Sequence, residues 1–222
     1  MNAAVVYVHG LWLSGHEGFM LRRRLEKERG YEWHAFGYAS TLLTMAEIAD
    51  ALDVTIKAID APIVHLVGHS LGGLAILRCL ERHPAQPPGR VVFLGTPCLA
   101  SRSANAVARF RFGRAILGQA ATEELLYAHE RTWRPGRELG IIAGNQSFSL
   151  GRLVTDFDEA NDGTVAVSET RLPGATAHIV LPVSHSGMLL SARVAHEVGQ
   201  FLELGHFGAA PANAAPSASP AP

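Results

Sequence analysis

Apolar residues along this chain fall into two alternating patterns. Short continuous runs rich in β-branched side chains are typical of strands buried on both faces of a sheet. Apolar residues that recur every three or four positions are typical of helices with one buried face. The runs predict strands at Val5–Val8, Tyr31–Tyr38, Ile63–Val67, Arg90–Leu94, Glu138–Ala143 and His178–Val183. The helical period predicts helices at Phe19–Glu28, at Thr44–Ile59, from Ser70 to about His83, and from about Ser191 to Leu204.

Strands that alternate with helices predict an α/β fold, with a mostly parallel sheet covered by helices on both faces. Ligands of such sheets bind beyond the carboxyl ends of the strands. The segment 99–131 has scattered Ala, Phe and Leu without a strand pattern, which predicts a small helical lid over a cleft. The tail 206–222 is rich in Ala and Pro and is expected to be disordered. We therefore expect one domain, 1–205.

Composition narrows the classes of function. The chain has 222 residues, 48% of them hydrophobic, which is enough for one domain with a real core. Its 19 basic and 20 acidic residues give a net charge of −1, so we expect no general attraction to nucleic acid or to anionic membranes. No run is long enough for stable membrane insertion, and the N-terminal sequence has no features of a secretory leader. These features, with two cysteines that form no metal pattern, favour the cytoplasm.

The stretch from Ile63 to about His83 contains the motif that indicates a catalytic residue. The strand Ile63–Val67 runs into Gly68-His69-Ser70-Leu71-Gly72, a G-x-S-x-G sequence, and a helix follows. Glycine and serine are common, so the five residues alone could match by chance. Strand, sharp turn and helix together favour a catalytic serine, because the strained turn lifts the hydroxyl clear of the sheet. The helix then points its free N–H groups at the place where negative charge develops.

A serine hydroxyl needs a base, and histidine suits that role near neutral pH. His185 follows the last predicted strand and lies in a loop at the expected edge, whereas His65 lies within a predicted strand and His178 at the start of one, away from that edge. A carboxylate must orient the base. Asp162 in Asn-Asp-Gly is preferred because that turn exposes a side chain at a loop tip; Asp158 is the alternative. Asp162 could also be an ordinary turn residue.

These residues resemble the α/β-hydrolase fold family, in particular small bacterial serine esterases and lipases, from Val5 to about Leu204. The resemblance rests on His9-Gly10 after the first strand, on the Ser70 motif, and on the chain order Ser70, Asp162, His185. It implies a Ser-His-Asp triad that cleaves carboxylic esters through an acyl-serine intermediate, without metal or cofactor. The first two strands usual in the family have no counterpart before Val5, so we expect a reduced, six-stranded sheet.

The resemblance also assigns the residues around the triad. The backbone N–H groups of Leu11 and Leu71 would stabilise the oxyanion, and His9 and Gly10 would support the Leu11 loop. Trp12 and His69 are candidates for the substrate pocket, with core packing an equal alternative for Trp12.

The expected partner is a small-molecule ester or lipid-like substrate. An acyltransferase with the same triad is an alternative, and a non-catalytic ligand-binding protein is a weaker one. The sequence predicts no particular oligomeric state.

Overall fold

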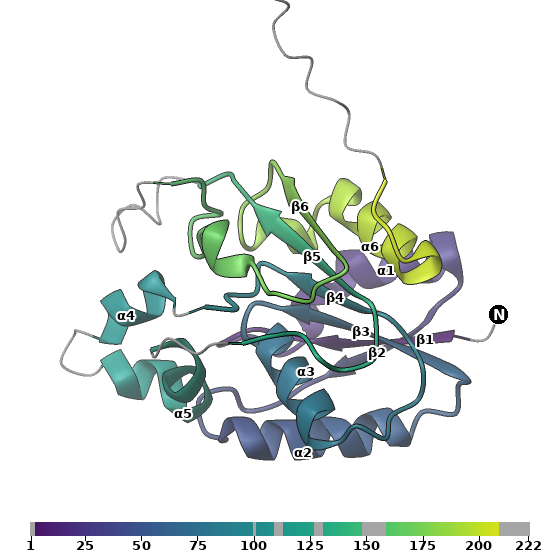
Figure 1. Ribbon diagram of the computed structural model, residues 1–222, viewed down its shortest axis with the longest axis horizontal. Coiled ribbons are helices and arrows are strands. Elements are labelled where there is room, and N and C mark those ends of the chain that lie inside the picture. The colour runs from purple at the N-terminus through teal and green to yellow at the C-terminus, as the bar shows by residue number, and fades with distance from the viewer. Residues whose placement is uncertain (1–2, 100, 109–112, 127–130, 148–158, 209–222) are drawn as a thin grey trace, which may run out of the picture.

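The computed structural model describes residues 3–99, 101–108, 113–126, 131–147 and 159–208. Its centre is a single six-stranded sheet with the order β2-β1-β3-β4-β5-β6, in which every neighbouring pair is parallel (Figure 1). The strands are β1 Ala3–Val8, β2 Glu32–Phe36, β3 Ile63–His69, β4 Val91–Leu94, β5 Leu139–Gly144 and β6 Ala177–Leu181. The predicted fold class and the reduced sheet are confirmed.

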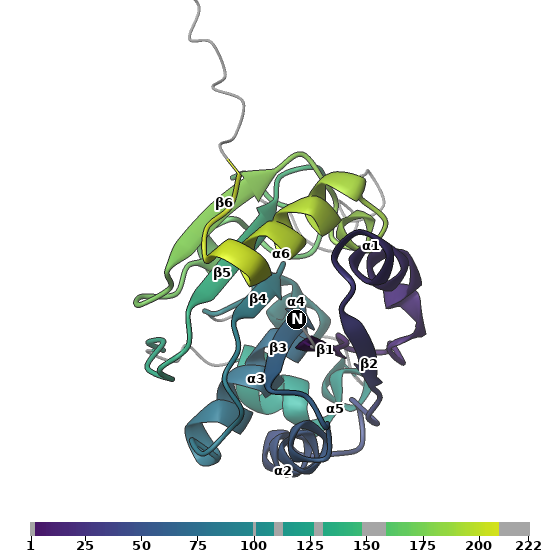
Figure 2. The same cartoon turned by 90° about the vertical axis from the view of Figure 1, so that its right-hand side faces the viewer.

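Helices cover both faces of the sheet. On one face lie α2 (Met45–Lys57) and α3 (Leu71–Arg82), and on the other lie α1 (Phe19–Arg29) and α6 (Ala192–Leu204), as Figures 1 and 2 both show. Each face has its own apolar cluster, one built around α2 and α3 and the other around α1 and α6. All residues of β1, β4 and β5 are buried, as the continuous apolar runs predict.

The centre of the sheet positions the serine. Strands β1 and β3 pair from Ala3 with Ile63 to Val8 with Gly68, so both end at the same edge. Helix α3 begins directly after Ser70. The loop that contains His9 and the turn that contains Ser70 are therefore neighbours at the carboxyl edge.

Element boundaries differ from the predictions by a few residues, for local reasons. The second strand is shorter than predicted, because only Glu32–Phe36 pairs with β1. Thr44 is the N-cap of α2 rather than its first residue. Its side chain accepts a hydrogen bond from the Glu47 N–H, and the Glu47 carboxylate accepts one from the Thr44 N–H.

Two short helices stand at the predicted lid, beyond the carboxyl ends of the strands (Figure 1). They are α4 (Arg102–Ala108) and α5 (Gly113–Leu125), and α5 is interrupted at Gly118, which has φ 77°. A β-carbon on Gly118 would lie 2.4 Å from Thr41 Cα, so only glycine fits this contact. Residues 100, 109–112 and 127–130 lie outside the described residues, and covering a cleft stays a prediction.

Residues 206–208, which the sequence pattern assigns to the disordered tail, are ordered in the structure. Phe207 is buried, with its ring 4.9 Å from the ring of Phe201 on α6. The Gly208 N–H donates to the buried carboxylate of Glu197 at 2.7 Å. This apolar packing extends the ordered chain to residue 208; residues 209–222 lie outside the described residues.

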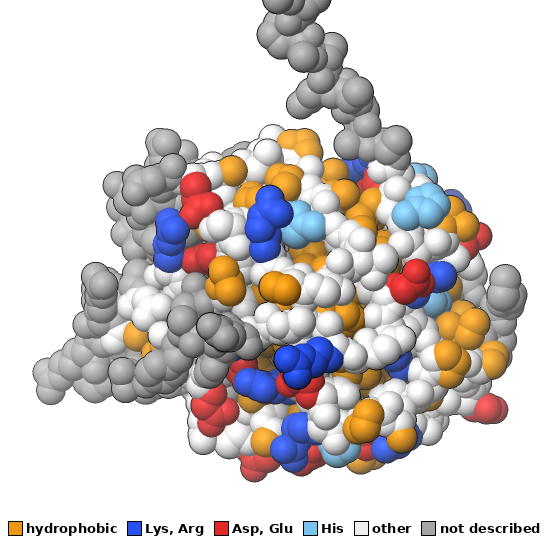
Figure 3. Space-filling model, in the orientation of Figure 1, with side chains coloured by type: hydrophobic (Ala, Val, Ile, Leu, Met, Phe, Trp, Pro, Cys, Tyr) orange, Lys and Arg blue, Asp and Glu red, His pale blue; other side chains and the backbone are white. Residues whose placement is uncertain are grey.

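Charged side chains of both signs are interspersed on the face shown in Figure 3, consistent with the near-zero net charge. Within the described part of the chain, no helix combines the length and the apolar character needed to span a bilayer.

Candidate active site

Ser70 sits in a strained backbone conformation at the end of β3. Its φ of 54° and ψ of −123° are unusual, and among the described non-glycine residues only Trp12 shares a positive φ. The Ser70 N–H donates to Leu94 O at 2.9 Å, and the Ser70 carbonyl accepts from the Gly73 N–H at 3.1 Å. Such strain persists only where neighbouring structure imposes it, and here it turns the chain from strand to helix within one residue.

Glycines on either side of Ser70 make this turn possible. A β-carbon on Gly68 would lie 2.6 Å from the Gly73 backbone, and one on Gly72 would lie 2.1 Å from Val8 O. Helix α3 therefore packs directly on the ends of β1 and β3. Its N-terminus, with unpaired N–H groups and the positive end of its dipole, begins beside the Ser70 side chain.

His185, which is partly exposed, and the buried Asp162 form a hydrogen-bonded pair. Their Nδ1 and Oδ2 atoms are 2.7 Å apart. The other carboxylate oxygen, Oδ1, accepts from the N–H groups of Thr164 at 2.9 Å and Val165 at 2.7 Å. The His185 N–H also donates to Asp162 O at 2.9 Å. Because the Asp162 carboxylate is fixed and only 2% exposed, it holds the ring with Nδ1–H as donor and leaves Nε2 as the basic atom.

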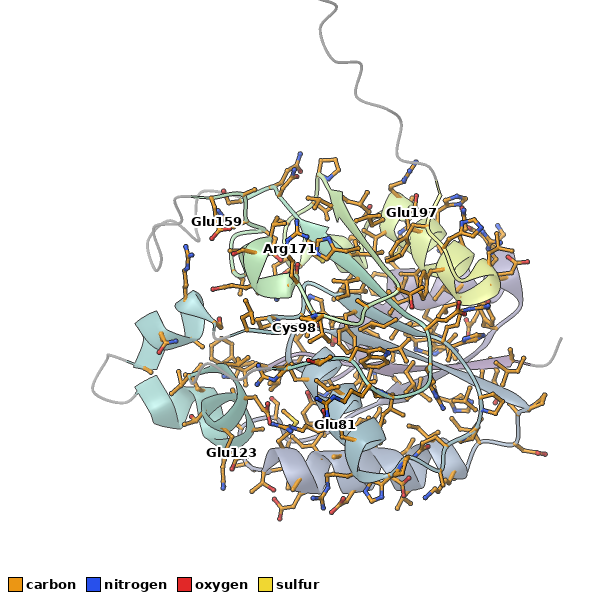
Figure 4. The ribbon with its side chains drawn as sticks, viewed as in Figure 1. Glu81, Cys98, Glu123, Glu159, Arg171 and Glu197 are labelled. Carbon is orange, nitrogen blue, oxygen red and sulfur yellow. The ribbon has the colours of Figure 1, made fainter. Side chains whose placement is uncertain are left out.

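This pair lies at the same edge as Ser70. A β-carbon on Gly95, after β4, would lie 3.0 Å from both Asp162 Oδ2 and His185 Nδ1. The ring of His69, the residue before Ser70, is 4.7 Å from the ring of His185. The loop that carries Asp162 runs between Glu159 and Arg171, which are labelled in Figure 4.

The loop after β1 is held by His9. Its Nε2 accepts from the Tyr38 N–H at 3.1 Å, which leaves Nδ1–H to donate to Gly10 O at 2.7 Å. The Tyr38 hydroxyl donates to His9 O at 2.8 Å, and the two rings stack at 4.1 Å. His9 is fully buried, and burial lowers its pKa, although these hydrogen bonds oppose the shift. It therefore contacts the loop rather than solvent.

Gly10 and Leu11 lie next to the serine. A β-carbon on Gly10 would lie 3.0 Å from Ser70 Cβ. The Trp12 N–H donates to Ser40 Oγ at 3.0 Å, whereas the Leu11 N–H has no acceptor among the described residues. The Leu71 N–H is at the first position of α3 and has no intrahelical acceptor. Both N–H groups assigned to the oxyanion are thus available to a ligand.

The candidate pocket residues differ in exposure. Trp12 is 58% exposed beside this loop. His69 is only 2% exposed, and its Nε2–H donates to His185 O at 3.0 Å. It therefore offers almost no surface to a substrate, which argues against His69 as a pocket wall.

Sequence reasoning missed several supporting residues. Glu17 accepts from Tyr7 OH at 3.0 Å and from the Gly15 N–H at 2.9 Å, and so fixes the loop after β1. Tyr38 and Ser40 brace the same loop from the end of β2. Tyr38 and Ser40 are polar residues that follow the carboxyl end of β2 within a few positions, and that placement is the sequence signal that could have indicated these two residues.

The sequence offered alternatives to these residues. Asp158 is outside the described residues, while His65 lies within β3 and His178 within β6. A cavity of about 620 Å³ lies at the amino ends of the strands, opposite Ser70, with Ala3, Ile63 and Glu138 in its wall. In the described part of the chain, no three His, Cys, Asp or Glu side chains gather as metal ligands would.

The sheet order, the strand–turn–helix at Ser70 and the His185–Asp162 pair define the class of α/β hydrolases. Comparison with known families agrees: residues 5–190 match the model of the alpha/beta hydrolase family. The chain belongs to this family. None of the functionally curated proteins matches it.

Solved structures of bacterial lipases and esterases share the fold. The mature lipase BlEst2 of Bacillus licheniformis is 21% identical, with a TM-score of 0.75 over 93% of both chains. Phospholipase PlaB of Legionella pneumophila is 17% identical, with a TM-score of 0.65 over 89% of this chain and 56% of PlaB. Carboxylesterase CesB of Bacillus subtilis is 12% identical, with a TM-score of 0.58 over 93% of this chain and 85% of CesB.

Proposed function

We propose that this protein is a serine hydrolase that cleaves carboxylic esters of small, apolar or lipid-like molecules. The observation that carries the proposal is the 2.7 Å contact between His185 Nδ1 and the buried Asp162 Oδ2 beside the strained Ser70 turn. A histidine oriented in this way by a carboxylate is the base that a serine nucleophile requires. The structural neighbours named lipase and carboxylesterase support the same reaction class.

In this mechanism Ser70 Oγ attacks the ester carbonyl while His185 Nε2 takes the hydroxyl proton. Asp162 stays ionised and stabilises the imidazolium. His185 then returns the proton to the leaving alcohol, and an acyl-serine remains. Water, deprotonated by the same nitrogen, attacks the acyl group; the bond from the acyl carbon to Ser70 Oγ breaks, His185 returns the proton to Oγ, and the acid is released.

Negative charge develops on the carbonyl oxygen during both steps. The Leu11 and Leu71 N–H groups would donate to that oxygen, helped by the N-terminal end of α3. Losing one such donor costs about 2.7–4 kcal/mol of barrier in serine hydrolases generally. His9 and Gly10 act by holding the Leu11 loop in place.

Exposed apolar side chains near this edge favour an apolar substrate. Trp12 is 58% exposed in the Leu11 loop, and Leu99, which follows β4, is 42% exposed. A substrate with apolar groups would cover these side chains and remove their surface from water. A cytoplasmic location remains a prediction from the sequence.

The decisive experiment compares Ser70→Ala with a matched control, Ser168→Ala, whose serine lies in the short helical turn Ser168–Thr170 and does not bond to the Asp162 carboxylate or the His185 ring. Ser70→Ala should lower p-nitrophenyl ester turnover by about 10⁵-fold or more, since the nucleophile is lost, while Ser168→Ala keeps it. A series of acyl chain lengths then defines the substrate. Full turnover by Ser70→Ala would remove Ser70 from the mechanism.

Two alternatives use the same site. An acyltransferase would hand the acyl group to an added alcohol, and formation of free acid alone would eliminate it. A non-catalytic binding protein would not be labelled by a fluorophosphonate, because only an activated serine reacts. The free pair of N–H groups at Leu11 and Leu71 favours the hydrolase over mere binding.

A further inference from the structure

His69 lies where three segments of the site meet. It precedes Ser70 in the chain, its Nε2 contacts His185 O at 3.0 Å, and its ring is 4.7 Å from the His185 ring, tilted by 45°. On its other side, a β-carbon on Gly10 would lie 3.3 Å from His69 Nδ1. One side chain thus bridges the nucleophile turn, the loop of the base and the loop after β1.

The contacts fix the protonation of the ring. A carbonyl oxygen only accepts, so Nε2 carries the hydrogen that bonds to His185 O. His69 Nδ1 is buried and has no hydrogen-bond partner among the described residues. A proton on Nδ1 would therefore be a buried donor without an acceptor, which is costly.

The ring consequently stays uncharged. Burial, and after it the neighbouring His185, lower the pKa of His69 to about 3. During catalysis His185 becomes an imidazolium, and a second positive charge 4.7 Å away would raise the energy of that state. A neutral donor holds the loop without this repulsion.

We propose that His69 is a positioning residue, whose Nε2–H holds the main chain of His185 and thereby sets the place of the catalytic imidazole relative to Ser70. This inference rests on the proposed function, since it assigns His185 as the base. It gives His69 a role in the reaction that involves no contact with substrate. A displacement of a catalytic group by about 1 Å can cost on the order of 10²-fold in rate.

Three substitutions at His69 separate the effect of the hydrogen-bond donor from the effect of the volume of the side chain. The amide nitrogen of His69→Gln reaches the position of Nε2 and can donate to His185 O. The shorter amide of His69→Asn reaches only the position of Nδ1, and His69→Leu has no donor. The kcat of the Asn and Leu variants should fall about 10- to 100-fold with KM within about twofold, while His69→Gln recovers most of the loss.

A merely structural role predicts otherwise. Gln, Asn and Leu would then lower kcat in proportion to their loss of thermal stability, and Gln would show no rescue. Equal kcat in all three variants and the wild type, or Gln as impaired as Leu, overturns the proposal. Using two variants without the donor keeps the test decisive if one of them fails to fold.

A second measurement needs no turnover. The Nδ1–H proton of His185, bonded to Asp162, gives a downfield NMR signal in an ordered pair. The signal should persist in the wild type and His69→Gln, and broaden or move upfield in His69→Asn and His69→Leu. If the wild type hydrolyses no ester, the proposed function fails, yet this signal still decides whether His69 positions His185. An unchanged signal in all variants overturns the positioning role.

Discussion

The individual residues of the candidate site differ in how far they are exposed to solvent. Asp162 is 2% exposed and accepts three hydrogen bonds, two from main-chain N–H groups and one from His185. Because these hydrogen bonds already hold the carboxylate in place, little reorganisation energy is needed when the histidine becomes charged. Ser70 is only partly buried, which leaves its hydroxyl accessible to a substrate.

Asp162→Asn tests the orienting role of the carboxylate. The amide oxygen can still accept from Thr164 and Val165, so the loop should keep its fold. The amide nitrogen would then face His185 Nδ1 and favour the wrong tautomer, so we expect kcat to fall on the order of 10⁴-fold. Stopped-flow ester hydrolysis measures it. The proposed triad is wrong if kcat falls less than about tenfold in a folded Asp162→Asn protein.

Sequence patterns indicate the candidate site residues more directly than the residues that support them. Ser70 stands in a motif whose glycines have a steric purpose, and Asp162 in a turn of recognisable chemistry. His69 follows no such rule: its contact with His185 O spans 116 positions and depends on how β3 and the last loop meet in space. Local sequence does not encode such a distance.

Among the elements, α5 of the predicted lid is joined to α3 by a charge network around the buried Glu124 carboxylate. Glu124 on α5 accepts from Arg78 Nε at 2.8 Å and from Arg131 Nη2 at 2.6 Å. Burial raises the pKa of Glu124, but these two guanidinium groups outweigh it and the net pKa is lowered. Arg131 Nη1 also donates to the carbonyl oxygen of Cys98, a residue that follows β4 and is labelled in Figure 4.

Glu124→Gln should therefore destabilise the protein by about 3–5 kcal/mol, because it leaves the buried Arg131 charge uncompensated. Glu81→Gln is the matched control. Glu81 pairs with the same Arg78, but its side chain is 38% exposed, so its loss should cost at most about 1 kcal/mol. Urea unfolding of both variants measures the difference. Equal stabilities would contradict a structural role for the network.

The extents of the elements followed from periodicity to within a few residues, and the exceptions have physical causes. Tyr31 and Tyr38 flank β2 without pairing, because β1 offers partners only from Ala4 to Val8. The sequence did not predict that Phe207 belongs to the core, because a single aromatic residue before an Ala/Pro-rich tail forms no periodic pattern. Its burial becomes evident only from its packing on Phe201.

At the scale of the whole molecule, alternation of strands and helices predicted the α/β class but not the order of the strands. That order depends on which strands pair, and continuous apolar runs such as Val91–Leu94 and Leu139–Gly144 are interchangeable by pattern. Two apolar layers enclose the sheet, and three histidines, His9, His65 and His69, are also buried in the described part of the chain.

These buried histidines make global stability depend on pH. Burial is the main cause that lowers the pKa of His65 to about 4 and of His69 to about 3, whereas unfolded histidines titrate near 6.5. Between those values the unfolded chain binds more protons, so the free energy of unfolding falls as the pH falls from 6.5 towards 4. Each group contributes up to about 1.4 kcal/mol per pH unit.

His65→Asn isolates one of these groups. The asparagine oxygen can still accept from the Arg90 N–H, which His65 Nδ1 binds at 2.9 Å, while the titrating ring is gone. Urea unfolding between pH 6.5 and 4.5 should show a shallower loss of stability than in the wild type. Glu169, whose pKa burial raises, acts in the opposite sense and is common to both proteins. Identical slopes would contradict the assignment to His65.

The all-parallel sheet has a consequence for how activity is regained after unfolding. No two neighbouring strands form a hairpin, so each pair of strands can form only after the crossover segment between them has brought the strands together. Ser70 stands at the end of β3 in the middle of the sheet, whereas Asp162 and His185 lie in loops that follow β5 and β6. Under the proposed function, ester turnover regained in a refolding experiment would require β3, β5 and β6 to be in place together, and would therefore report assembly of the sheet and not the collapse of the core.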